Sequence, residues 1–154
     1  MTHVLAIDQG TSGTKAVVVA DDSVLSLAEA PVRPEYGEGG VVEQDPRALL
    51  DSVLDAGRRA VVAAGVPIDI VTLANQGESV LAWDPGTGEP LTPVVVWQDS
   101  RAQAVCDELA AHAPLVARRT GLVLDPYFSA PKQAWVRRNL TREGVVTTTD
   151  SWLL

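Results

Sequence analysis

The pattern of apolar and polar positions predicts three strands at the start of the chain. Residues 4–7 and 16–19 are apolar, largely β-branched runs, and a third such run at 24–30 follows the polar turn at 21–23. Runs of this kind separated by short polar turns are typical of antiparallel hairpins. We therefore expect a three-stranded antiparallel meander, with the polar segment 8–15 at its first turn.

A helix is predicted after a loop at 31–40 that is rich in proline and glycine. Asp45 followed by Pro46 is a helix-start signal, because aspartate favours the N-cap and proline the first helical position. Apolar residues then recur every three or four positions as far as Ala64, and Gly65 ends the pattern. This spacing predicts an amphipathic helix from 46 to 64.

Strands and helices alternate in the rest of the chain, around an irregular segment that contains Asp125-Pro126. The strands at 68–74 and 93–97 lead into polar clusters. In open α/β sheets ligands bind where strands end at a crevice, so both clusters are candidate edges of a site. Strands are expected at 68–74, which should be buried, 80–83, 93–97 and 145–149, and helices at 101–113, 114–119 and 131–140.

Composition narrows the class of protein. The chain has 154 residues, 46% hydrophobic and 21% charged, which is typical of one compact globular unit. Its net charge of −8 and the lack of a basic stripe argue against nucleic-acid and acidic-membrane partners. Small anionic ligands can still bind. Cys106 is alone, and no leader or membrane-spanning run is present, so we expect a cytoplasmic protein.

The first turn carries candidate chemistry. Gly10 to Thr14 have little side-chain bulk, so backbone N–H groups can approach a phosphate and the hydroxyls can add donors. Asp8 beside this loop suits a hydrated magnesium ion, which needs few protein carboxylates. The segment is not a Walker A loop, since GxxxxGK[ST] is absent. An ordinary glycine-turned hairpin, with Asp8 as a turn residue, explains the same residues.

Several motifs follow one another from end to end: LAIDQGTSGTKAVV, GGVVEQDP, LANQGES, VVVWQDSR, TGLVLDPYFSAPK and TTDSWLL. In this order they resemble the N-terminal domain of the FGGY family of carbohydrate kinases, most closely its glycerol kinases. The resemblance implies an α/β fold of the actin/hexokinase (ribonuclease H-like) type. Such a domain has a mixed sheet that starts with an antiparallel three-stranded meander and is flanked by helices.

The resemblance also implies ATP-dependent phosphorylation of a hydroxyl group on a polyol or sugar. Asp8 would face the hydrated Mg²⁺, and the loop residues Gly10, Thr11 and Ser12 would lie near the transferred phosphate. Lys15 matches a basic position in glycerol kinases and would contact phosphate. A solvated cation on the second strand is the alternative interpretation of Lys15.

The implied acceptor site departs from the family in one residue. The family's glycerol-binding motif reads NQRE, and here Gly77 replaces the arginine. Glycine offers no donors and leaves room for a bulkier substrate, so a longer polyol or a ketopentose is an alternative to glycerol. The residues that the resemblance assigns to the acceptor are Gln76, Glu78, Asp99 and Tyr127. Structural roles are the alternative: Gln76 and Glu78 would cap the end of a strand, and Asp99 would start a helix.

The family's catalytic base and most of its adenosine pocket belong to later segments. The resemblance therefore implies that residues 1–154 are an N-terminal FGGY domain truncated before the base and the second domain, with little activity alone. A homo-oligomer is compatible with the family. The alternative from a different class is a non-catalytic, actin-like binding module.

Overall fold

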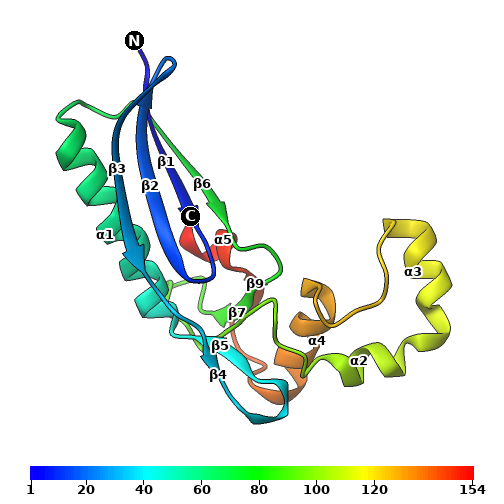
Figure 1. The fold of residues 1–154 in the computed structure, drawn as a ribbon. Helices are drawn as coiled ribbons and strands as arrows, with labels where there is room; N and C mark the ends of the chain where they lie inside the picture. Colours follow the sequence, from blue (N-terminus) through cyan, green and yellow to red (C-terminus); the bar gives the residue numbers. More distant parts are fainter. The chain divides into compact units, whose positions relative to one another are not determined.

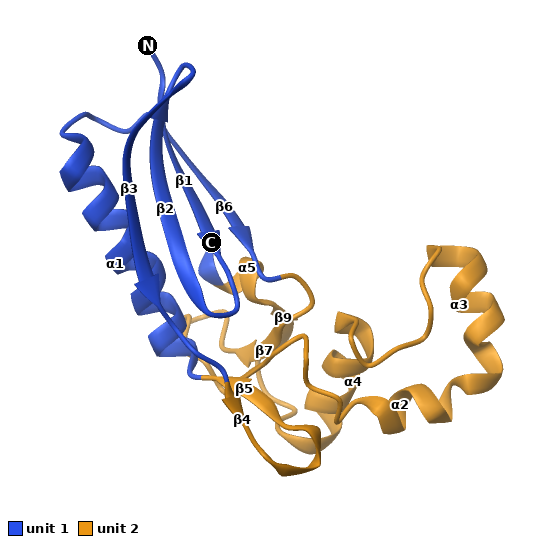
Figure 2. Cartoon of the chain, in the orientation of Figure 1, with its two compact units in different colours: residues 1–34, 45–76, 153–154 blue, residues 35–44, 77–152 orange.

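The computed structural model describes all residues from Met1 to Leu154, and they form two compact units (Figures 1 and 2). Unit 1 comprises Met1–Pro34, Asp45–Gln76 and Leu153–Leu154, and unit 2 comprises Glu35–Gln44 and Gly77–Trp152. This differs from the single compact unit that composition predicts. The difference arises because the chain builds two β-sheets, each with its own apolar core.

Unit 1 contains a mixed four-stranded sheet in the order β3-β2-β1-β6. Its strands are β1 (His3–Gln9), β2 (Gly13–Ala20), β3 (Ser23–Pro31) and β6 (Ile70–Asn75). The first three pair antiparallel along the chain, with one irregularity in register between Val18 and Val19, and β6 pairs parallel to β1. The predicted meander is therefore confirmed, because its turns are local and its strands are β-branched.

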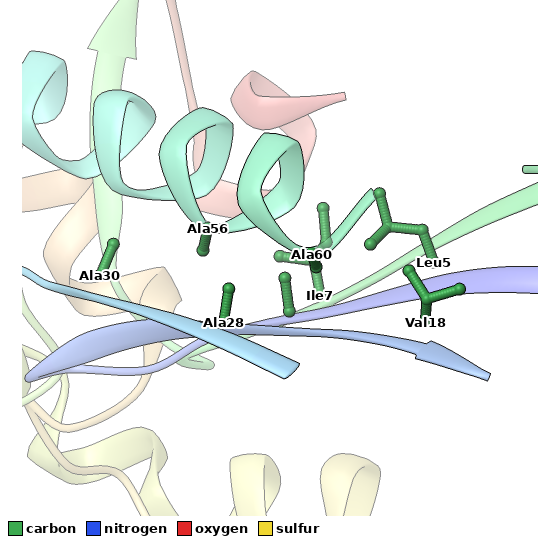
Figure 3. Packing of buried hydrophobic residues seen from close by; sticks show 8 residues of the cluster. Leu5, Ile7, Val18, Ala28, Ala30, Ala56 and Ala60 are labelled. Atoms are coloured by element: carbon green, nitrogen blue, oxygen red, sulfur yellow. The ribbon is translucent and has the colours of Figure 1, made fainter. Parts of the chain in front are cut away.

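Helix α1 (Pro46–Ala64) packs on one face of this sheet (Figure 3). Asp45 caps it by accepting a hydrogen bond from the Arg47 N–H at 2.8 Å, and Gly65 ends it with a left-handed φ of 64°. Alternate strand residues face the helix, and small side chains there allow close packing. The buried cluster consists of Leu5, Ile7, Ala16, Val18, Ala28, Ala30, Ala56 and Ala60.

The predicted burial of the strand at 68–74, which is β6, is wrong. The apolar run at 68–74 predicts a buried strand, but Ile70 and Val71 on β6 are 48% and 62% exposed. The strand lies at the edge of the sheet and has a single neighbour, β1. Periodicity identifies an apolar strand, but its burial depends on what covers it.

Unit 2 contains a five-stranded antiparallel sheet in the order β4-β5-β8-β7-β9. Val80, Ala82 and Val95 form its core with Val136, and Trp135 and Val146 pack against them. Strand β8 is shorter than the predicted 93–97. The Val96 N–H still donates to the Val42 carbonyl, but the Val42 N–H donates to the Asp99 carboxylate, so the pairing with β5 ends there. The strands are β4 (Glu35–Tyr36), β5 (Val42–Gln44), β7 (Val80–Trp83), β8 (Val94–Val95) and β9 (Val145–Thr148).

The helices of unit 2 are short. The predicted helix 101–113 is wrong as a continuous element, because the chain forms α2 (Gln103–Glu108), a 3-10 turn (Ala110–His112) and then α3 (Ala113–Thr120). Helix α3 confirms the predicted helix 114–119, and Gly121 ends it with φ of 75°. Helix α4 (Ser129–Asn139) confirms the predicted helix near 131–140. A 3-10 turn (Glu38–Gly40) and α5 (Thr149–Leu153) were not predicted. None of these helices is long and apolar enough to span a membrane.

Candidate active site

The turn between β1 and β2 forms the glycine and hydroxyl loop. The two strands pair as far as Gln9 and Thr14, so residues 10–13 make the reversal, closed by a hydrogen bond from the Gly10 N–H to the Gly13 carbonyl at 2.9 Å. A Cβ at Gly13 would lie 3.0 Å from the Ala30 carbonyl oxygen on β3. Glycine at this position therefore allows close approach of the neighbouring strand.

Asp8 and Lys15 lie directly opposite each other on β1 and β2. Because side chains alternate along a strand and Ile7 faces α1, Asp8 faces away from that helix. An open pocket of about 490 Å³ lies there, lined by both residues and by Thr72 of β6. The Lys15 ammonium is 3.8 Å from the Glu29 carboxylate on β3, and both side chains are more than half exposed. This exposed cation beside Asp8 and the loop can contact an anionic ligand.

Gln76 is joined to this loop through Gln9. The Gln76 N–H donates to the Gln9 carbonyl at 2.7 Å, and the two side-chain amides are 3.5 Å apart. The Gln9 amide donates in turn to the Gly10 carbonyl at 2.7 Å. Both side chains are buried. Sequence reasoning missed Gln9, although a polar residue at the inward position that follows Leu5 and Ile7 is an available signal.

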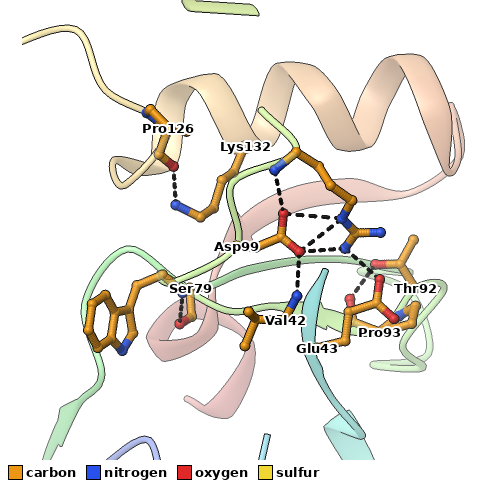
Figure 4. Close-up of polar contacts among 10 residues, drawn as sticks. Val42, Glu43, Ser79, Thr92, Pro93, Asp99, Pro126 and Lys132 are labelled. Carbon is orange, nitrogen blue, oxygen red and sulfur yellow. Dashed lines mark hydrogen bonds and ion pairs between the residues drawn. The ribbon is translucent and has the colours of Figure 1, made fainter. Parts of the chain in front are cut away.

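Asp99 of unit 2 is buried and hydrogen-bonded to neighbouring residues of the same unit (Figure 4). Its side chain is 1% exposed and accepts hydrogen bonds from the Val42 N–H at 2.8 Å and the Arg101 side chain at 2.9 Å. Arg101 also contacts the Glu43 carboxylate at 2.6 Å and lies over the Trp135 ring. Burial alone would lower the pKa of Arg101, but the hydrogen bonds and charges of the two carboxylates raise it above its ordinary value.

Glu78 lies at the start of helix α4. Its carboxylate accepts hydrogen bonds from the Ser129 backbone N–H at 2.5 Å and from the Ser129 hydroxyl. The N-cap residue Phe128 offers no side-chain cap, so this carboxylate satisfies the helix end and complements its dipole. Glu78 adopts a φ of 68°, which is uncommon for a residue with a side chain.

Tyr127 belongs to the segment that leads into α4. Its N–H donates to the Asp125 carboxylate at 2.8 Å, and its ring makes edge contacts with Trp97 and Phe128, at centroid distances of 5.5 and 5.1 Å. The side chain is 44% exposed. A phenol held by aromatic neighbours and open to solvent can bind a hydroxylated ligand.

Sequence reasoning also missed Lys132. This residue of α4 is fully buried, and its ammonium donates to the carbonyls of Pro126 and Tyr127. Burial lowers its pKa to about 8, while the negative charges of Asp99 and Glu78 act in the opposite direction. A lysine among the helical residues looks solvent-exposed from sequence alone, and no local signal marks it as buried.

The structure thus brings the predicted residues together in two groups. In unit 1, Asp8, Lys15 and Gln76 lie with the loop Gly10–Ser12 at the end of β1 where the loop begins. In unit 2, Glu78, Asp99 and Tyr127 surround Lys132.

The fold and the loop together define the class: a ribonuclease-H-type α/β domain of the actin-like kinases. The chain belongs to the FGGY family of carbohydrate kinases, and residues 3–153 match the N-terminal domain of that family. The predicted fold class and family are therefore confirmed.

Curated proteins and solved structures agree with this assignment. The chain is 39% identical to a glycerol kinase from Aromatoleum aromaticum, in a match that covers 100% of this chain and 34% of that protein. It superimposes on the crystal structure of Plasmodium falciparum glycerol kinase with ADP with a TM-score of 0.91 at 25% identity, covering 99% of this chain and 33% of that one.

A xylulose kinase from Rhodospirillum rubrum shares the fold, with a TM-score of 0.89 at 22% identity over 98% of this chain and 33% of that one. The chain thus spans about a third of the length of the curated relatives it matches.

Proposed function

We propose that this chain is the phosphate-loop and acceptor-binding part of an ATP-dependent kinase that phosphorylates a hydroxyl group of a polyol or sugar. The observation that carries the proposal is the pairing of Asp8 with Lys15 beside the loop Gly10–Ser12. Phosphoryl transfer needs positioning and charge stabilisation more than covalent chemistry from the protein. Backbone N–H groups, hydroxyls and a cation at one strand end suit that task.

The residues at this strand end are compatible with magnesium. No group of three or more His, Cys, Asp or Glu side chains forms a metal cage. Mg²⁺ is usually held by one or two carboxylates, waters and substrate phosphates, so the single exposed carboxylate of Asp8 fits this mode. The ion would neutralise phosphate charge when bound. Gly10, Thr11, Ser12 and Lys15 would contact the phosphates of ATP.

Acceptor binding is proposed for Gln76, Glu78, Asp99 and Tyr127. A carboxylate and a phenol can accept from and donate to vicinal hydroxyls, and such a site rejects analogues that lack them. Glu78 and Tyr127 are anchored by neighbouring groups, and Tyr127 is open to solvent. The Asp99 carboxylate is already bound to Arg101 and Val42, which favours a supporting role over direct contact.

A longer polyol or a ketopentose is the second candidate acceptor. A Cβ built at Gly77 meets nothing within 4 Å, and Gly77 is not among the glycines of positive φ, so a side chain fits there without backbone strain. We expect Gly77→Arg to shift preference toward glycerol by adding fixed donors, whereas Gly77→Ala should leave the preference unchanged. Equal preference in both variants would contradict an enlarged pocket at this position.

The proposal places residues 1–154 in the N-terminal domain of a two-domain kinase, with the catalytic base and most of the adenosine pocket supplied by other segments of the complete protein. We also propose a cytoplasmic protein that can form homo-oligomers and has no nucleic-acid or membrane partner. A net charge of −8 supports the last point.

The test is an ATP-consumption assay of the complete product of the gene that encodes this chain, with glycerol, erythritol, ribitol, xylulose, ribulose and gluconate as acceptors. Asp8→Asn should reduce turnover by about a hundredfold or more, because it removes the carboxylate proposed to face the metal. Asp22→Asn, an exposed carboxylate in the turn between β2 and β3, is the matched control and should leave turnover unchanged. Absence of turnover with every acceptor would favour a non-catalytic actin-like module.

A further inference from the structure

Lys132 is a lysine without solvent contact. It lies in the first turn of α4, and its ammonium donates to the carbonyl of Pro126 (Figure 4). The ammonium also donates to the carbonyl of Tyr127. Lysine is almost never fully buried unless its charge is paired. Both carbonyls belong to the segment that carries Tyr127, one of the proposed acceptor ligands.

Stability does not explain a cation at this position. The N-terminus of a helix disfavours positive charge, and burial removes the ammonium from water. Burial is also the largest cause of the lowered pKa of Lys132, which falls to about 8. Well-packed apolar side chains often replace buried ionic groups without loss of stability. The lysine therefore calls for another explanation.

Three of the groups near the ammonium, Glu78, Asp99 and Tyr127, belong to the proposed acceptor site. Glu78, Asp99 and Asp125 each raise the pKa of Lys132 by charge attraction, as does Cys106 of α2. The ring of Tyr127 lies with its centroid 5.9 Å from the ammonium nitrogen. These groups come from four separate segments, so the lysine is their common neighbour.

We propose that Lys132 is a positioning residue of the acceptor site, which fixes the segment 125–128 through two backbone carbonyls and so sets the Tyr127 side chain. Glu78 holds the next residue, Ser129, through its N–H and hydroxyl. A cation thus holds the segment 125–128, and an anion holds the residue that follows it. The inference rests on the proposed function, which makes Glu78 and Tyr127 ligands of the acceptor.

The role gives a specific pH dependence. A neutral amine keeps two donors, but hydrogen bonds from a charged donor are about twice as strong. Acceptor affinity should therefore weaken as the pH rises through about 8. Arginine stays charged throughout this range, so Lys132→Arg should remove the dependence.

The experiment compares Lys132→Met, Lys132→Arg and Arg138→Met in the complete gene product. Arg138 lies on the same helix and forms an exposed ion pair with Glu108, so its variant removes a solvent-exposed cation. KM for the acceptor, KM for ATP, kcat and thermal melting are measured on both sides of pH 8. Lys132→Met should raise KM for the acceptor about tenfold and leave KM for ATP unchanged.

The control Arg138→Met should match the wild type, and Lys132→Arg should keep acceptor affinity above pH 8. Equal rises in both KM values, or no change in either, would overturn the inference. If Lys132→Met does not fold, the pH profile of Lys132→Arg against wild type decides.

A wild type without turnover refutes the proposed function separately. The effect of Lys132 on the segment 125–128 is then measured in the 154-residue chain by the amide chemical shifts of Tyr127 and Ser129. These shifts should change with pH near 8 in the wild type and not in Lys132→Arg. Shifts that do not change in the wild type would refute the positioning of the segment by Lys132.

Discussion

At the scale of single residues, burial determines how much stability is lost when an ion pair is broken. Arg101 and Asp99 are 2.8 Å apart, and Arg138 and Glu108 are 2.7 Å apart, so their geometry is nearly equal. The first pair has side chains 17% and 1% exposed, and the second 53% and 60%. Screening by water makes the exposed pair weak, whereas removal of one buried partner leaves an uncompensated charge.

Asp99→Asn should therefore destabilise unit 2 by about 2 kcal/mol, since it removes one of the two carboxylates that contact the Arg101 guanidinium and leaves Glu43 as the other. Glu108→Gln, the matched control, should change stability by less than about 1 kcal/mol. Urea unfolding followed by tryptophan fluorescence measures both, because Arg101 lies over the Trp135 ring. Similar losses in the two variants would show that burial does not distinguish the pairs.

Lys132 gives a second prediction at this scale, on stability against pH. The unfolded lysine keeps its proton up to its ordinary pKa of 10.5, and the folded one loses it near 8. Between these values the unfolded state binds more protons, so the free energy of unfolding should rise with pH. Subtracting the curve of Lys132→Met from that of the wild type isolates this contribution. A difference that falls or stays flat between pH 8 and 10.5 would contradict the lowered pKa.

At the scale of secondary-structure elements, local signals determine some parts and long-range contacts the others. The meander and α1 follow from β-branched runs, Asp45-Pro46 and Gly65, which act within a few residues. The exposure of β6 depends on which elements pack against it, and those lie far along the chain, so periodicity does not reveal it.

The same division holds for the site. The loop beside Asp8 is predictable because glycines and hydroxyls mark a phosphate loop locally. The role of Lys132 is not predictable from the sequence, because Glu78 and Asp99, which lie near its ammonium, are tens of residues away in sequence. Only the fold brings them to α4. Gln9 is an intermediate case, since its inward position is local but its partner Gln76 is not.

The cap of α1 offers a test of these local signals. Asp45→Ala removes the acceptor of the Arg47 N–H, and losing an N-cap costs about 1 kcal/mol of stability. Asp51→Ala changes an exposed aspartate inside the same helix, where alanine is the better helix former, and should not destabilise. Chemical denaturation monitored by helical circular dichroism compares the two. Equal stability of Asp45→Ala and the wild type would mean that Pro46 and packing alone start the helix.

At the scale of the whole molecule, the boundary between the units passes through the motif Asn75-Gln76-Gly77-Glu78-Ser79. Gln76 is hydrogen-bonded to Gln9 in unit 1, and Glu78 is bonded to Ser129 in unit 2. Two residues of one short segment are thus anchored to different cores. Each anchor lies within its own unit, and side chains held by hydrogen bonds and packing keep their geometry there.

The last prediction concerns the chain assayed by itself. A general base must come within hydrogen-bond reach of the hydroxyl it activates, and the proposed function assigns that base to another segment of the complete protein. Asp99 is already engaged by Arg101, and Glu78 by Ser129. We therefore expect the 154-residue chain to hydrolyse or transfer no phosphate above background, while the complete gene product turns over under the same conditions. Turnover by the isolated chain would refute the proposed division of the site between this chain and other segments of the complete protein.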